Sequence, residues 1–81
     1  MQLQEFIKQE IKNLAFKEVG YSDSLLKSGI LDSITAVDLA VSIEDKYNIK
    51  IPFTEINNQN FETINNIISY LELKFKLQLN E

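Results

Sequence analysis

The spacing of the apolar residues is the feature that most restricts the fold of this chain. Near the N-terminus apolar side chains recur at steps of three and four residues, at Leu3, Phe6, Ile7, Ile11 and Leu14. This is the period of an amphipathic helix with one face towards a core, and it predicts a helix over residues 2–16. The same spacing returns near the C-terminus, at Phe61, Ile64, Ile68, Leu71 and Phe75. It predicts a last helix over residues 61–75.

A third periodic stretch begins at Asp32-Ser33 and extends to about Tyr47. Aspartate and serine accept hydrogen bonds from the free amides of a first helical turn, so the pair predicts the start of a helix over residues 33–47. Pro52 marks its end, because proline lacks an amide donor and disfavours helical geometry in the residue before it. Residues 53–56 can then form one short helical turn, followed by a polar connector over residues 57–60 that ends in a candidate N-cap.

These elements predict an all-α fold, a small four-helix bundle with three main helices and a short third one. A chain of 81 residues has the size of one domain, so we expect a single domain over residues 1–81. Residues 17–31 lack periodicity and predict a long loop pinned to the core by its own apolar side chains, and such loops are usually functional. The predicted core consists of Phe6, Ile7, Ile11, Leu39, Ile43, Tyr47, Ile64, Ile68 and Leu71.

The composition excludes several classes of function. Cysteine and histidine are absent, which removes disulfides, the usual zinc and haem ligands, and the commonest general base and nucleophile. We therefore expect neither an enzyme nor a metal site. The net charge of −4 has the wrong sign for binding phosphate backbones, so nucleic acid is not an expected partner. No apolar run approaches the roughly 20 residues that span a bilayer. We expect a cytoplasmic protein that does not insert into membranes.

The negative charge is concentrated in the middle of the chain. Residues 29–58 contain five acids and two lysines, whereas residues 1–28 contain four of each. A charge asymmetry of this kind steers basic partners towards one part of a protein surface.

The predicted helix over residues 33–47 has two apolar faces. Its continuous stripe, which we expect to face the core, contains Ala36, Leu39, Ala40, Ile43 and Tyr47. Nearly opposite lies a second stripe of three aliphatic and three acidic residues: Ile34, Val37, Val41, Asp38, Glu44 and Asp45. Because a helix in a small bundle buries one side, the second stripe is predicted to be an exposed protein-docking surface. In the alternative interpretation, the preceding loop covers Ile34 and Val37.

Ser33 lies in the first turn of this helix, at the end of the long loop. The positive end of the helix dipole and the free amides there would accommodate a phosphate on its hydroxyl. By residue chemistry alone, however, Asp32 and Ser33 more often form only a helix cap.

The wider sequence resembles the acyl carrier and peptidyl carrier protein family over almost the whole chain. In that family a glycine followed by an Asp-Ser-Leu signature marks the serine that receives phosphopantetheine. Here Gly29 precedes Asp32-Ser33-Ile34, a conservative departure from that signature. The likeness continues through an acidic pair, an aromatic residue and a short apolar segment ending at Pro52, and then through Phe61-Glu62-Thr63. The resemblance implies a bundle of the acyl-carrier type.

The resemblance also implies a discrete acyl or aminoacyl carrier protein. A phosphopantetheinyl transferase would attach phosphopantetheine from coenzyme A covalently to Ser33, and the thiol of that arm would hold the cargo as a thioester. Asp32 would cap the helix and help to present metal-bound coenzyme A. A loading ligase and a downstream transferase or synthase, both with basic docking surfaces, would meet the carrier, which we expect to be a monomer. The implied docking residues are Ile34, Val37, Asp38, Val41, Glu44 and Asp45.

The sequence departs from the carriers of housekeeping fatty-acid synthesis, because Ala40, Ser42 and Lys46 interrupt the acidic run of the helix. A specialised system is favoured: polyketide, nonribosomal-peptide or modified-lipid synthesis, or D-alanine transfer to a cell-envelope polymer. The sequence leaves the cargo open. A competing hypothesis is a carrier-like adaptor that only binds proteins, with Ser33 as an unmodified cap. A small autonomous enzyme is disfavoured, because no histidine or lysine lies beside Ser33 to activate its hydroxyl.

Overall fold

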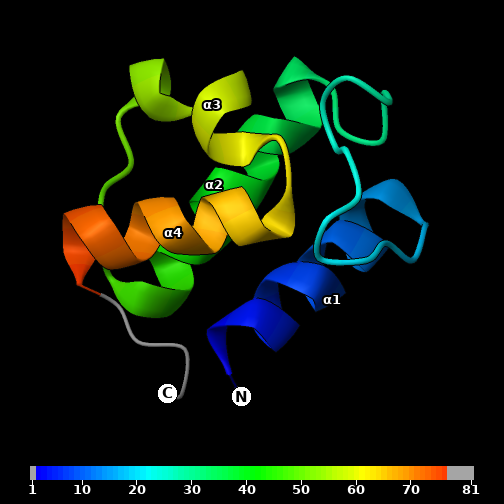
Figure 1. The fold of residues 1–81 in the computed structure, drawn as a ribbon. Coiled ribbons are helices and arrows are strands. Elements are labelled where there is room, and N and C mark those ends of the chain that lie inside the picture. The colour runs from blue at the N-terminus through cyan, green and yellow to red at the C-terminus, as the bar shows by residue number, and fades with distance from the viewer. Residues whose placement is uncertain (1, 77–81) are drawn as a thin grey trace.

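The computed structural model describes residues 2–76, and within that range every regular element is helical (Figure 1). The long helices are α1 (Leu3–Ala15), α2 (Ser33–Tyr47) and α4 (Ile64–Phe75). Between α2 and α4 lie a 3₁₀ turn, η1 (Phe53–Glu55), and a single-turn helix, α3 (Asn58–Phe61). The predicted all-α bundle with three main helices is confirmed.

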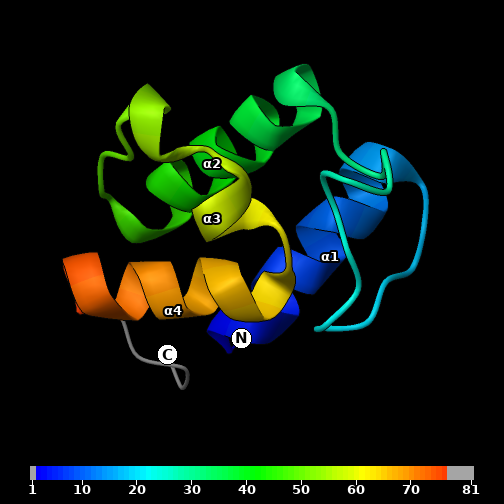
Figure 2. The same ribbon diagram turned by 45° about the horizontal axis from the view of Figure 1, so that its top comes forward.

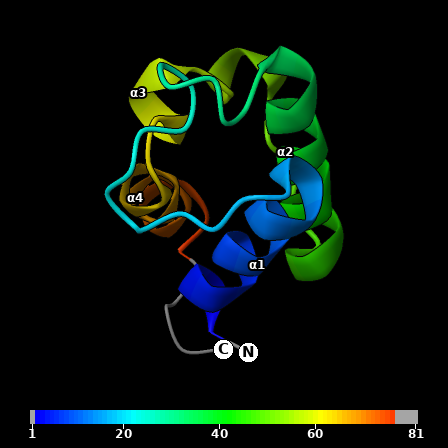
Figure 3. The same cartoon turned by 90° about the vertical axis from the view of Figure 1, so that its right-hand side faces the viewer.

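The helices pack so that α1 contacts both α2 and α4, and α3 contacts α4. Figures 1 and 2 place η1 and α3 at the same end of the bundle as the start of α2. Figure 3 shows the loop between α1 and α2 passing beside α4 and α3 before it enters α2. This route brings the loop, η1 and α3 around the N-terminal end of α2, where Ser33 lies. None of the helices within residues 2–76 is long and apolar enough to cross a membrane.

The core contains most of the predicted residues. Seven of them are buried: Ile7, Ile11, Leu39, Ile43, Ile64, Ile68 and Leu71. Phe6 and Tyr47 are instead half-buried, and their rings pair edge to face with centroids 5.8 Å apart. The loop is pinned as expected, since Leu25 and Leu31 are buried among the helices. Folding of the core therefore also fixes the loop.

The last helix begins later than predicted. Phe61 ends α3, and α4 starts at Ile64 behind Thr63, whose extended backbone separates the two helices. Thr63 Oγ1 accepts a hydrogen bond from the Asn66 amide at 3.0 Å and so caps α4. The polar connector predicted over residues 57–60 is largely α3 itself. The apolar spacing continues through the break because both helices turn apolar side chains towards one core, and Phe61 remains fully buried.

Candidate functional site

Asp32 caps the first turn of α2 through a capping box. Its Oδ1 accepts hydrogen bonds from the amides of Ile34 and Thr35 at 3.0 and 2.8 Å, and from the Thr35 hydroxyl at 2.9 Å. Thr35 Oγ1 in turn accepts from the Asp32 amide at 2.8 Å. The bonds from the Thr35 amide and hydroxyl lower the pKa of the Asp32 carboxyl, so it is ionised at neutral pH. The cap was predicted, whereas the role of Thr35 was missed, because the usual capping-box signature has Ser or Thr at the cap and Glu or Gln three residues later.

Ser33 is the first residue of α2, and its side chain is exposed. Within residues 2–76 no group forms a hydrogen bond with its hydroxyl. The residue lies at the edge of a surface groove of about 300 Å³ that is lined mainly by apolar side chains. Its lining includes Leu26 from the long loop, and Phe53 and Ile56 from the segment that follows α2. A reagent can therefore reach the hydroxyl from solvent.

The electrostatics around Ser33 differ from the prediction in one respect. The amides of Ile34 and Thr35, which were expected to be free for a phosphate, already donate to Asp32. A phosphate on Ser33 would still lie at the positive end of the α2 dipole, but next to an ionised carboxylate. All three hydrogen bonds to the Asp32 carboxylate use Oδ1, and none within residues 2–76 uses Oδ2. The described residues contain no cluster of three or more metal-binding side chains.

Glu62 holds the loop that leads to Ser33. Its carboxylate accepts from the Ser24 hydroxyl and from the Lys27 amide, the latter at 3.4 Å, and its carbonyl accepts from the Leu25 amide at 2.7 Å. The turn then closes at Gly29, whose φ of 84° favours glycine because a side chain would strain the backbone there. The role of Glu62 was missed, because nothing in the sequence pairs it with residues that lie 35 and more positions away.

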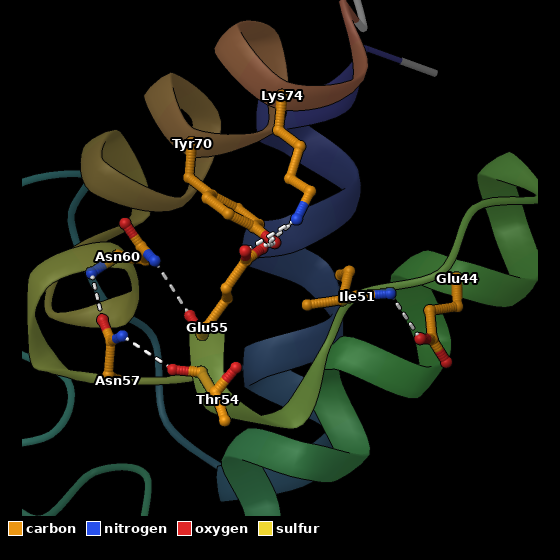
Figure 4. Close-up of polar contacts among 8 residues, drawn as sticks. All are labelled: Glu44, Ile51, Thr54, Glu55, Asn57, Asn60, Tyr70 and Lys74. Atoms are coloured by element: carbon orange, nitrogen blue, oxygen red, sulfur yellow. Dashed lines mark hydrogen bonds and ion pairs between the residues drawn. The ribbon is translucent and has the colours of Figure 1, made fainter.

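Glu55, which lies between Phe53 and the groove-lining Ile56 in sequence, holds η1 against α4 (Figure 4). Lys74 Nζ donates to both carboxylate oxygens at 2.7 and 2.6 Å, and the Tyr70 hydroxyl donates to Oε1. The bonds from Lys74 and Tyr70 lower the pKa of the Glu55 carboxyl. Burial and the adjacent Glu55 raise the pKa of the Tyr70 hydroxyl. The Glu55 carbonyl accepts from Asn60 Nδ2 at 3.0 Å, which ties η1 to α3 as well.

The predicted docking stripe of α2 is exposed along much of its length. The side chains of Ile34 and Val41 are 70% and 53% exposed, and those of Asp38 and Asp45 are also exposed. Val37 is half-buried and lines the groove. The loop therefore does not cover Ile34, contrary to the alternative interpretation. Exposure is what a docking surface requires, and the docking role itself remains a prediction.

Glu44 differs from the other acidic residues of the stripe. It is half-buried, and its Oε2 accepts a hydrogen bond from the Ile51 amide at 2.7 Å (Figure 4). This bond fastens the segment after α2 to the helix. From the sequence Glu44 is predicted to take part in docking alone, and this structural contact was not foreseen.

Comparisons with known proteins point to one kind of site. The profile of a family described as "Phosphopantetheine attachment site" matches residues 2–71. The D-alanyl carrier protein of Streptococcus suis strain 98HAH33 is 35% identical over 71 residues, which cover 85% of this chain and 90% of that protein. The D-alanyl carrier protein of Leuconostoc mesenteroides subsp. mesenteroides is 28% identical over 74 residues, or 89% of this chain and 95% of that protein.

Proposed function

Because this chain belongs to the phosphopantetheine-binding carrier protein family, we propose that it carries D-alanine as a thioester on a phosphopantetheine arm attached to Ser33. The family match spans residues 2–71, and the similar curated proteins named above are D-alanyl carrier proteins. The arm supplies the reactive thiol, which accords with a chain that contains no cysteine.

One observation carries the assignment to Ser33. It is an exposed serine at the start of a capped helix, beside a groove, and its hydroxyl has no partner within residues 2–76. The Ser24 hydroxyl donates to the Glu62 carboxylate, and the Ser28 hydroxyl donates to the Ser24 carbonyl. Ser22 Oγ accepts from Asn65 Nδ2 at 3.2 Å. Ser33 is therefore better placed than the loop serines to enter another enzyme's active site.

The modification is a phosphoryl-type transfer run by the transferase. A bond forms between Ser33 Oγ and the β-phosphorus of coenzyme A, the bond between that phosphorus and the bridging pyrophosphate oxygen breaks, and adenosine 3′,5′-bisphosphate leaves. The hydroxyl proton passes to a base of the transferase, because Asp32 has a lowered pKa and is a poor base. Asp32 Oδ2 would bind the divalent cation that accompanies coenzyme A.

The cargo and the partners follow from the same proposal. An adenylating ligase would load D-alanine onto the thiol, and a downstream transferase would take it. Both would meet the acidic face of α2 with basic side chains, and small, electrostatically steered contacts would suit a carrier that must leave each partner quickly. The chain would act as a monomeric single domain in the cytoplasm and would not itself be a catalyst.

Intact mass spectrometry tests the proposal in two steps. The full chain is first incubated with coenzyme A, magnesium and a broad-specificity phosphopantetheinyl transferase. We expect a gain equal to the mass of the arm, and no gain for Ser33→Ala. The holo form is then incubated with ATP, a D-alanine ligase and either D- or L-alanine. Loading with D-alanine alone is expected. An unmodified chain would instead support the adaptor hypothesis, and modification without loading would reject D-alanine as the cargo.

A further inference from the structure

Phe53 is an exposed aromatic residue that lines the groove together with Leu26. Its side chain is 72% exposed, and it is the first residue of η1. A single exposed apolar residue needs no explanation. Phe53, however, lines the same groove as Ser33, and the exposed Ile34 is the next residue of α2. One exposed apolar side chain thus shares the groove with the candidate attachment point, and another directly follows that point in sequence.

The turn that bears Phe53 is held firmly although its ring is exposed. Within the turn, the Ile56 amide donates to the Phe53 carbonyl at 3.0 Å. The Glu55 carboxylate is bound by Tyr70 and Lys74, which belong to α4. Asn57 Nδ2 also donates to the Thr54 carbonyl at 3.0 Å. An aromatic side chain on a fixed backbone loses little conformational entropy on binding, which is the property of an anchor residue.

We infer that Phe53 is an anchor for the phosphopantetheinyl transferase, and that Glu55 and Tyr70 are residues that position it. The inference rests on the proposed modification of Ser33. The transferase must form a bond to Ser33 Oγ itself, so it has to cover the groove that Phe53 lines. The exposed acid Asp32 lines this groove, and the exposed Asp38 directly follows Val37, which also lines it. The complementary surface is therefore an apolar pocket edged by basic side chains.

Steady-state kinetics of modification test the anchor role of Phe53. The concentration of the full apo chain is varied, and the probe is a phosphopantetheinyl transferase with coenzyme A and magnesium. Phe53→Ala should lower kcat/KM by about tenfold, mainly through KM, because anchor residues carry much of the binding energy of an interface. Phe53→Leu should recover part of the loss. Phe16→Ala is the matched control, because Phe16 is 90% exposed but lines a different groove with Lys12 and Lys17. It should react at the wild-type rate.

A double-mutant cycle tests the positioning role. Tyr70→Phe removes the hydroxyl that binds Glu55 but keeps the ring contacts with Phe61 and Phe75, at centroid distances of 6.2 and 6.0 Å. We expect kcat/KM to fall by about threefold, the size of one modest hydrogen bond. In the Phe53→Ala background the same change should have no further effect, because it acts through the position of the ring. A merely structural role would give equal losses in both backgrounds.

The outcomes separate this inference from the proposed function. If the wild-type chain is modified and Phe53→Ala is modified equally fast, the anchor role is wrong and the proposed function stands. If the wild-type chain is not modified, both fail. Thermal melts of the apo and holo forms complete the test. If Phe53→Ala changes the shift in Tm from the apo to the holo form but not the rate of modification, the ring contacts the arm and not the transferase. That result would overturn the inference.

Discussion

The two faces of α2 contain similar aliphatic residues but have opposite surroundings. On the inner face Ala36, Leu39 and Ile43 are buried, and they pack among the other helices. On the outer face Ile34 and Val41 are exposed, and acidic residues adjoin them. Hydrophobicity alone therefore does not identify the core residues of so small a protein. The arrangement of apolar and acidic residues around the helix axis separates the residues that stabilise the fold from those available to partners.

The inner face should control stability, and the largest change in stability is expected there. Ile43→Ala should lower the free energy of unfolding by roughly 2 to 4 kcal/mol, because Ile43 is fully buried and its loss leaves a cavity. Urea denaturation followed by circular dichroism measures this change. Well below its melting temperature, the variant should still accept the arm at the wild-type rate. If Ile43→Ala had the free energy of unfolding of the wild type but failed to be modified, the two faces would be assigned the wrong way round.

The outer face should show the reverse behaviour. Val41→Asp should change the free energy of unfolding by less than about 0.5 kcal/mol, because Val41 is 53% exposed. It should nevertheless lower kcat/KM for modification or loading by about tenfold, since it places a charge in an apolar contact. Ser42→Ala, one position along the same helix and outside the docking stripe, is the control. Unfolding of the chain by Val41→Asp would contradict the assignment of Val41 to the outer face.

Much of this division could be predicted from the sequence. Periodicity located α1, α2 and α4, and it separated Leu39 and Ile43 from Ile34 and Val41, because the helical period is a local property. The capping residue Asp32 was also predictable from its type and place. The break at Thr63 was not predictable, because the apolar spacing continues through it: α3 and α4 both turn apolar side chains towards the same core. Nor were the contacts of Glu62 with the loop and of Glu55 with α4, because they join residues distant in sequence whose pairing only the folded packing determines.

Glu44 belongs to the outer stripe of α2 but also makes a structural contact with Ile51. Glu44→Ala removes the acceptor for the Ile51 amide and should destabilise the fold by about 1 kcal/mol. Glu44→Gln keeps an acceptor oxygen and removes only the charge, so it should leave the melting temperature nearly unchanged. If Glu44 also contributes to docking, Glu44→Gln will still slow modification. A normal modification rate for Glu44→Gln would restrict Glu44 to its structural contact with Ile51.

Asp38 should give the smallest effect and the one most specific to the outer face. Its side chain is exposed, so Asp38→Lys should leave stability unchanged within about 0.5 kcal/mol. The reversal should still slow association with a basic partner, because exposed charges raise the on-rate more than they add affinity. Charges on a surface are screened over about 8 Å at physiological ionic strength, so the defect should shrink as sodium chloride is raised. Modification kinetics of wild type and Asp38→Lys at several salt concentrations measure this convergence. Val41→Asp in the same series should be rescued less, because salt does not restore its lost apolar contact. A defect of Asp38→Lys that is independent of salt would show that Asp38 acts by a direct contact and not by steering.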